Sequence, residues 1–166
     1  MNGWNNEILL PLLVSNLVGL IILVFCWRSA RIGRLLMMLL FIWAGCINWY
    51  TAITNPSDYL NYADYALLPS YKTFILGWFS DHVLLMVGTI ATGQLLIGIS
   101  MLFRGSILKL GILAGILFFI GILPLGLGAG FPFPAIGALA FYQLYRKRQS
   151  DFLWNKVARS WLNIRA

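Results

Sequence analysis

Residues 105–147 read GSILKLGILAGILFFIGILPLGLGAGFPFPAIGALAFYQLYRK, and this stretch decides the fold class. It contains two apolar runs that are joined by a segment rich in proline and glycine, between Pro124 and Pro134, with basic residues at both open ends. Long, continuous apolar runs are typical of membrane-crossing helices rather than of membrane strands, which alternate polar and apolar residues. The stretch therefore predicts two membrane helices connected by a tight turn.

The composition of the whole chain indicates the same class. Of its 166 residues, 60% are apolar and only 10% are charged, and the mean hydropathy is +0.82. A soluble domain carries about 25% charged residues, and a chain of this size could not hide so much apolar surface from water. Because the apolar runs are continuous, helices are favoured over a barrel. We therefore expect an all-α polytopic membrane helical bundle.

Five apolar segments are candidate membrane-spanning helices. Four of them are about 20 residues long, which is enough to cross a bilayer, and these are residues 8–27, 35–53, 82–103 and 107–125. The fifth, residues 131–145, would form only about 22 Å of helix. It crosses only if the preceding turn dips into the membrane or the bilayer thins locally.

The positive charges favour the fifth crossing. A basic loop holds Arg28, Arg31 and Arg34, and with five spans all but one of the 12 Lys and Arg residues fall on the same side of the membrane. Only Lys72 falls opposite, whereas four spans would split the basic clusters between both faces. Because loops rich in Lys and Arg stay in the cytoplasm, we predict an inner (plasma) membrane protein with an outside N-terminus and a cytoplasmic C-terminus. The net charge of +7 then reflects membrane topology, and no nucleic-acid ligand is expected.

The long outer segment between the second and third spans is expected to be helical. Residues 54–81 carry tyrosines at helical spacing, and Pro69 divides the segment into two pieces. A row of tyrosines suits interfacial helices that lie at the level of the lipid headgroups. The sharper interpretation is a structured lid over the mouth of the bundle.

The chain divides into a membrane bundle, residues 1–149, and a cytoplasmic tail, residues 150–166. The tail is predicted to form an amphipathic basic helix that lies on an anionic membrane surface, and docking on a partner protein is the alternative. The tail residues expected at that surface are Trp154, Lys156, Arg159 and Trp161.

Few residues are suited to chemistry inside the bundle. No Asp, Glu, Lys or Arg lies in the middle of a predicted span, which disfavours a pump or secondary transporter. No nucleophile motif, phosphate-binding loop or metal-ligand spacing is found, and Cys26 and Cys46 are expected to be buried apolar residues. We therefore assign no catalytic and no metal-ligating residue, and the sequence leans against an enzyme.

Three amides lie away from the cytoplasmic ends of the predicted spans: Asn16 and Gln94 near the middle, and Asn48 nearer the outer end. They are expected to make hydrogen bonds between helices. The alternative is a polar anchor for a small ligand inside the bundle, for which a quinone or a lipid is the candidate cofactor. The residues that would line such a site are Trp43, Asn48, Tyr59, Tyr62 and Gln94.

One layout of motifs runs through residues 31–145. A basic start leads into a helix with small residues, then a long outer segment, a further helix, a short basic turn and the paired helices with their Pro/Gly turn. The motifs are Arg31-x-x-Arg34, Ala44-Gly45, Gln94-Leu95-Leu96-Ile97-Gly98, Leu125-Gly126-Leu127-Gly128 and Phe131-Pro132. This layout resembles the DoxX-like membrane proteins. The resemblance implies a four-helix membrane bundle made of spans two to five, with the first span and the tail as additions.

What the resemblance implies about function is broad. Some DoxX-like proteins are linked to quinone-dependent oxidation of sulfur compounds, and others to redox or assembly roles. This chain lacks the paired cysteines through which some relatives work, so no catalytic residue is carried over. The first function expected is a non-catalytic subunit or scaffold that binds another membrane protein or a second copy, which the small size, the absent catalytic cluster and the two helical appendages favour. The alternative is a quinone- or lipid-binding subunit of a membrane redox system. A small permease comes last, because the predicted spans lack charge in the middle.

Overall fold

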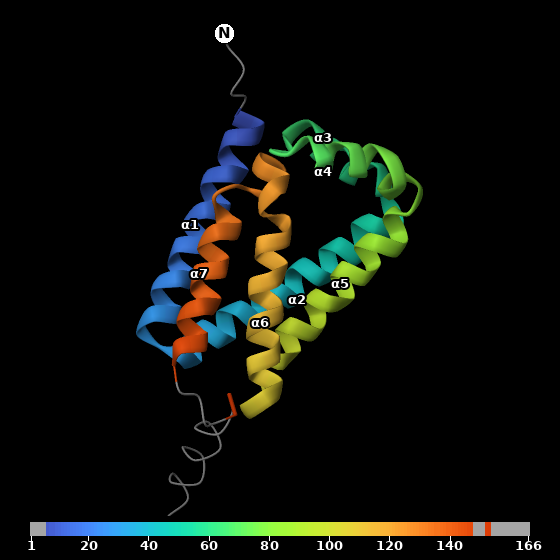
Figure 1. The fold of residues 1–166 in the computed structure, drawn as a ribbon. Coiled ribbons are helices and arrows are strands. Elements are labelled where there is room, and N and C mark those ends of the chain that lie inside the picture. The colour runs from blue at the N-terminus through green and yellow to red at the C-terminus, as the bar shows by residue number, and fades with distance from the viewer. Residues whose placement is uncertain (1–5, 148–151, 154–166) are drawn as a thin grey trace, which may run out of the picture.

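The computed structural model describes residues 6–147 and 152–153, and this part of the chain is helical without any strand (Figure 1). The expectation of an all-α bundle is therefore confirmed. The long helices are α1 (Asn6–Arg28), α2 (Ala30–Thr54), α5 (Val83–Ser100), α6 (Gly105–Ile122) and α7 (Phe133–Arg146). The short helical segments are η1 (Pro56–Asn61), α3 (Tyr62–Tyr65), α4 (Pro69–Phe74), η2 (Ile75–Phe79) and η3 (Leu123–Ala129).

Four of the helical stretches are long and apolar enough to cross a membrane. They are Leu9–Arg28, Ala30–Thr54, Val83–Ser100 and Gly105–Ala129. Helix α7 has 14 residues, fewer than the roughly 20 that a straight crossing requires. The four apolar helices agree with the predicted membrane protein, and the fifth crossing stays a prediction.

The long helices form two layers. Helices α2 and α5 pack against each other in one layer, and α7 packs between α1 and α6 in the other. Short turns connect the layers at one end, through Ser29 between α1 and α2 and through residues 101–104 between α5 and α6. Toward the opposite end, the α2–α5 layer slants away from α1 and α6 (Figure 1). The layers therefore diverge in the direction of α3 and α4.

Arg34 makes hydrogen bonds that stabilise the bundle at the end where the two layers meet. Its Nε and Nη2 atoms donate to the Met101 carbonyl oxygen at 2.9 and 2.6 Å, and Nη2 also donates to that of Phe103 at 2.5 Å. These carbonyls follow the carboxyl end of α5, where the helix dipole favours a cation. The predicted loop around Arg31 and Arg34 is wrong: α2 begins at Ala30 because Ser29 caps it, so both arginines lie in its first turns.

Glycines allow close packing between α6 and α7. A Cβ atom on Gly115 would lie 2.5 Å from Cζ of Phe141, and one on Gly137 would lie 2.5 Å from Cε2 of Phe119. Each aromatic ring thus fills the space opposite a glycine of the other helix. The rings of Phe119 and Phe141 also pack edge-on against Phe41 of α2, with centroids 5.5 and 5.4 Å away. This cluster is the core that joins the two layers.

The outer segment lies across the end at which the layers diverge (Figure 1). We call residues 56–79 the lid. The lid contacts η3 and the end of α6. The Leu67 amide donates to the Pro124 carbonyl of η3 at 2.8 Å, and the Tyr71 hydroxyl donates to the Gly121 carbonyl of α6 at 3.0 Å. Gly126 has a φ of +63° and faces the Tyr65 carbonyl so closely that a Cβ atom would collide with it. The predicted helical outer segment is confirmed, with α4 beginning at Pro69.

Candidate functional site

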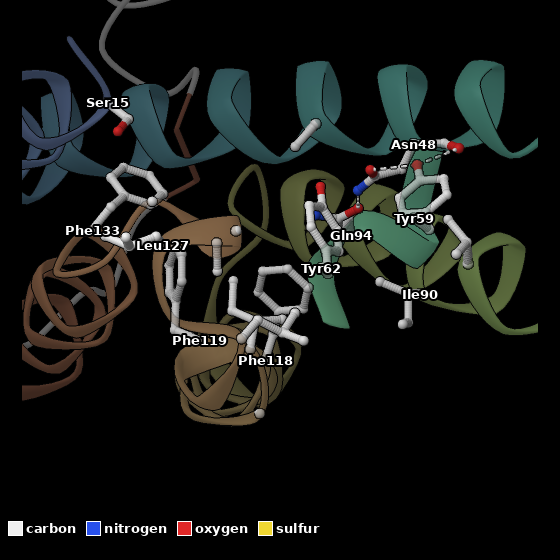
Figure 2. Close-up of a pocket in the computed structure, with 18 of the residues that line it drawn as sticks. Ser15, Asn48, Tyr59, Tyr62, Ile90, Gln94, Phe118, Phe119, Leu127 and Phe133 are labelled. Atoms are coloured by element: carbon white, nitrogen blue, oxygen red, sulfur yellow. Dashed lines mark hydrogen bonds between the residues drawn. The ribbon is translucent and has the colours of Figure 1, made fainter. Parts of the chain in front are cut away.

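A cavity of about 1240 Å³ lies between the two layers and beside the lid (Figure 2). All five long helices and the lid contribute to its wall, and most of the lining side chains are aliphatic or aromatic. Ligand pockets usually measure about 300–1,000 Å³. The cavity is therefore large enough for a lipid-soluble molecule with a long apolar part.

A chain of hydrogen bonds forms one polar end of the cavity. The Tyr59 hydroxyl, from η1, donates to Oδ1 of Asn48 on α2 at 2.9 Å. The Nδ2 atom of Asn48 then donates to Oε1 of Gln94 on α5 at 2.7 Å. Figure 2 shows these side chains together with Tyr62 at one end of the cavity. The chain links the lid to both helices of the α2–α5 layer.

The two tyrosines of this polar end stay protonated at neutral pH. Burial raises the pKa of Tyr59 to about 12, and the neighbouring Tyr62 adds to the effect. Burial likewise raises the pKa of Tyr62, followed by the charge of the Asp58 carboxylate. Both hydroxyls are therefore neutral groups that can donate a hydrogen bond.

The opposite wall of the cavity is aromatic. Phe118 and Phe119 from α6 pack edge-on with ring centroids 5.5 Å apart, and Phe133 from α7 lies 5.8 Å from Phe119. Ser15 of α1 lies near this wall (Figure 2), and its hydroxyl donates to the Leu12 carbonyl at 2.9 Å. The cavity thus has a hydrogen-bonding end on α2 and α5 and an apolar wall on α6 and α7.

Some lining residues are exposed on the outside of the bundle. Val14 and Val18 of α1 are 52% and 40% exposed, and Trp43 of α2 is 65% exposed. All three are apolar and lie on the two helices that diverge from the turn at Ser29. These exposed lining residues suit contact with lipid better than contact with water.

The structure brings the five predicted lining residues to one cavity. Trp43, Asn48, Tyr59, Tyr62 and Gln94 all belong to its wall. The expected interhelical hydrogen bonding is confirmed for the Asn48–Gln94 pair. Binding of a ligand by these five residues stays a prediction.

Asn16 has a separate structural role. Its Nδ2 atom donates to the carbonyls of Leu12 and Gly130, at 2.8 and 3.1 Å, so it ties α1 to the turn before α7. Its Oδ1 atom is buried and has no hydrogen-bond partner in the described part of the chain. Asn16 does not line the cavity.

The sequence interpretation missed the aromatic wall, which consists of Phe118, Phe119 and Phe133. Phenylalanine is equally at home on a lipid-facing helix surface, so no local signal sets these rings apart. Cys26 is buried as expected, but the expectation is wrong for Cys46, which is exposed on α2. Within residues 6–147 and 152–153, no group of three or more His, Cys, Asp and Glu residues is placed to hold a metal ion.

The tail residues Trp154, Lys156, Arg159 and Trp161 lie outside the described residues. The two described residues before them contact the turn between α5 and α6. The Leu153 amide donates to the Leu102 carbonyl at 3.2 Å, and the Arg104 guanidinium lies 4.6 Å from the centre of the Phe152 ring. Phe152 and Leu153 therefore lie at the end of the bundle where the two layers meet.

No protein-family model, curated protein or solved structure matches this chain. The function is accordingly argued from the chain's own cavity and its lining residues.

Proposed function

We propose that this protein is a multi-pass membrane protein that holds one lipid-soluble molecule in the cavity between its helix layers, as a quinone- or lipid-binding subunit. The observation that carries the proposal is a large apolar cavity with one hydrogen-bonding end, formed by Tyr59, Asn48 and Gln94. Concave, mostly apolar sites with a few convergent polar groups are typical of ligand-binding pockets.

The size and low polarity of the cavity favour an apolar ligand over water. At about 30 Å³ for each molecule, its volume corresponds to roughly 40 waters. The lining offers little to hold that many waters, since none of the described residues that form it is charged, and apolar cavities stay dry and bind apolar guests. A hydrocarbon chain with a small polar head satisfies both parts of the wall.

A small permease is supported less well. Transport sites near the membrane midplane usually contain ionisable residues or broken helices. Within residues 6–147 and 152–153, no Asp, Glu, Lys, Arg or His lines the cavity. A scaffold role is compatible with the same fold, but no feature of the described residues favours it over ligand binding.

We also propose five membrane crossings, with the N-terminus outside and the C-terminus in the cytoplasm of the inner membrane. The support is that α7 packs along α1, and the Lys147 ammonium donates to the Trp27 carbonyl at the end of α1. If α1 crosses, a helix that ends beside it reaches the same side. The four-helix core implied by the DoxX-like resemblance would then be α2, α5, α6 and α7.

Co-purification tests the ligand-binding proposal. The protein is purified in mild detergent, and its extract is compared by mass spectrometry with an extract of the surrounding membrane. We expect one enriched quinone or lipid species. Ala44→Phe, which fills the cavity, should lose that species, whereas Ala114→Phe on the exposed face of α6 should keep it. An extract with the same composition as the membrane, from wild type and both variants, would refute the proposal.

Cysteine labelling tests the topology. Single cysteines are placed at Ser57, Ser106 and Ser150 in a background with Cys26→Ala and Cys46→Ala. With five crossings, an impermeant thiol reagent applied to intact cells should label only the cysteine at Ser57, because the other two sites face the cytoplasm. Labelling at Ser150 together with Ser57 would show that α7 does not cross.

A further inference from the structure

The hydrogen bonds at the polar end run in one direction. Tyr59 donates to Asn48, and Asn48 donates to Gln94. This order uses Oδ1 and Nδ2 of Asn48 and Oε1 of Gln94. The Nε2 amide of Gln94 stands at the end of the chain, and no hydrogen bond to it is found among the described residues.

This amide is open to the cavity rather than sealed in protein. Gln94 is 4% exposed, so its surroundings are almost entirely protein and cavity. In the described part of the chain, the one buried side-chain nitrogen or oxygen that lacks both a partner and solvent access is Oδ1 of Asn16. The Gln94 Nε2 atom must therefore be reachable from the cavity that its side chain lines.

Tyr62 supplies a second donor of the same kind. Its ring lines the cavity and is fixed by edge-on packing on Tyr59, with centroids 5.8 Å apart, and by close contact with Gly128. Within residues 6–147, no hydrogen bond is found for its hydroxyl. Figure 2 shows Tyr62 and Gln94 at the same end of the cavity.

We propose that the ligand of this cavity presents a carbonyl oxygen, which accepts hydrogen bonds from Gln94 Nε2 and from the Tyr62 hydroxyl. This inference rests on the proposed ligand-binding function. A carbonyl oxygen has two lone pairs and no hydrogen, so it matches two donors. An ammonium group offers only donors, and a plain hydrocarbon leaves both protein groups unpaired, which is costly in an apolar site.

The lack of charge in the described lining limits which head groups the cavity can bind. A carboxylate would be buried without a counter-ion, since no Lys, Arg or His in the described part of the chain lines the cavity, and an unpaired buried charge is strongly disfavoured. The carbonyl is therefore neutral. Quinones carry such a carbonyl on the ring, and acylglycerols carry it in their esters; these two classes are the ones tested below.

Binding to purified protein in detergent tests the head group with three probes: decylubiquinone, dioleoylglycerol and hexadecane. We expect one of the two carbonyl probes to bind about tenfold or more tightly than hexadecane, and the better of the two identifies the source of the carbonyl. Gln94→Leu and Tyr62→Phe should each raise the dissociation constant of that probe by roughly threefold to tenfold. The matched controls, Thr89→Val and Tyr65→Phe, lie outside the cavity wall and should bind like wild type.

Infrared spectroscopy distinguishes a direct hydrogen bond to the ligand from a purely structural role of Tyr62, because only a direct bond shifts the ligand's carbonyl band. The carbonyl stretch of the bound probe should shift to lower frequency in wild type, and the shift should shrink in Tyr62→Phe. Equal binding of hexadecane and the carbonyl probes, or an unshifted carbonyl band in the wild-type complex, would overturn the inference while leaving the ligand-binding function standing. If none of the three probes binds and no lipid co-purifies, the proposed function itself fails.

Discussion

Replacing Gly137 with alanine should destabilise the packing between α6 and α7. A Cβ atom at this position would lie 2.5 Å from Cε2 and 2.8 Å from Cε1 of Phe119, whereas carbon atoms in contact are normally about 3.5–4.0 Å apart. The ring or the helix would have to move by about 1 Å. Phe119 is 2% exposed and touches the rings of Phe41, Phe133 and Phe141. Any shift of its ring, even toward the cavity that it borders, therefore disturbs these contacts.

The expected cost follows from two opposing terms. Overpacking of a filled core costs about 1–3 kcal/mol, and this site belongs at the upper end because the Phe119 ring cannot move without disturbing three neighbouring rings. Replacing a glycine with alanine inside a helix raises the unfolding free energy by about 0.5–1 kcal/mol. We therefore expect Gly137→Ala to lose about 2 kcal/mol of unfolding free energy.

Thermal unfolding in detergent measures the effect, with Gly93→Ala as the matched control. Gly93 lies inside α5, and a Cβ atom there would meet no heavy atom within 4 Å. At about 2–4 °C per kcal/mol for a chain of this size, Gly137→Ala should melt roughly 4–8 °C below wild type, and Gly93→Ala at or above it. Adding Phe119→Leu to Gly137→Ala should recover part of the loss. If both alanine variants melt alike, the described packing of α7 on α6 is wrong.

Two further predictions concern Arg34 and the tyrosines of the lid. Arg34→Met should lower the unfolding free energy by about 2–3 kcal/mol, because charged hydrogen bonds to the carbonyls after α5 are lost. Urea or thermal unfolding measures this loss. The control is Arg28→Gln, at an exposed position, which should have little effect on stability. For Tyr59, burial raises the pKa from its ordinary value of 10.0 to about 12, so the unfolded chain releases this proton first, and stability should fall as the pH rises through that interval. When tyrosinate absorbance is followed as the pH rises, wild type should show a phenol that ionises late, and this late ionisation should be missing in Tyr59→Phe.

The sequence predicts the helical class and most helix positions because long apolar runs and Pro/Gly breaks are strong local signals. It does not predict which faces pack together. In a membrane protein, lipid-facing and buried residues are both apolar: Leu17 on α1 is exposed, whereas Ile22 on the same helix is buried. The divergence of the two layers, and hence the cavity, depends on this packing and leaves no trace in hydrophobic periodicity.

The polar part of the candidate site was predictable for the opposite reason. Amides such as Asn48 and Gln94 are rare inside apolar spans and need partners, so they stand out. Arg34 was missed because a basic residue beside a span is normally expected to reach water or headgroups. Only the folded chain shows that the carbonyls of Met101 and Phe103 lie within its reach.

The lid has a structural consequence for the cavity, because it is bonded to both layers at once. Tyr59 holds it to the α2–α5 layer through Asn48, and Leu67 and Tyr71 hold it to the end of α6 and to η3. The layers themselves are joined at the opposite end by short turns and by Arg34. The distance between the layers is therefore fixed at both ends: by the turns and Arg34 where the layers meet, and by the lid where they diverge. The bond that holds the lid also belongs to the chain that orients Gln94, and displacing Tyr59 would therefore disturb both the width of the cavity and its polar end.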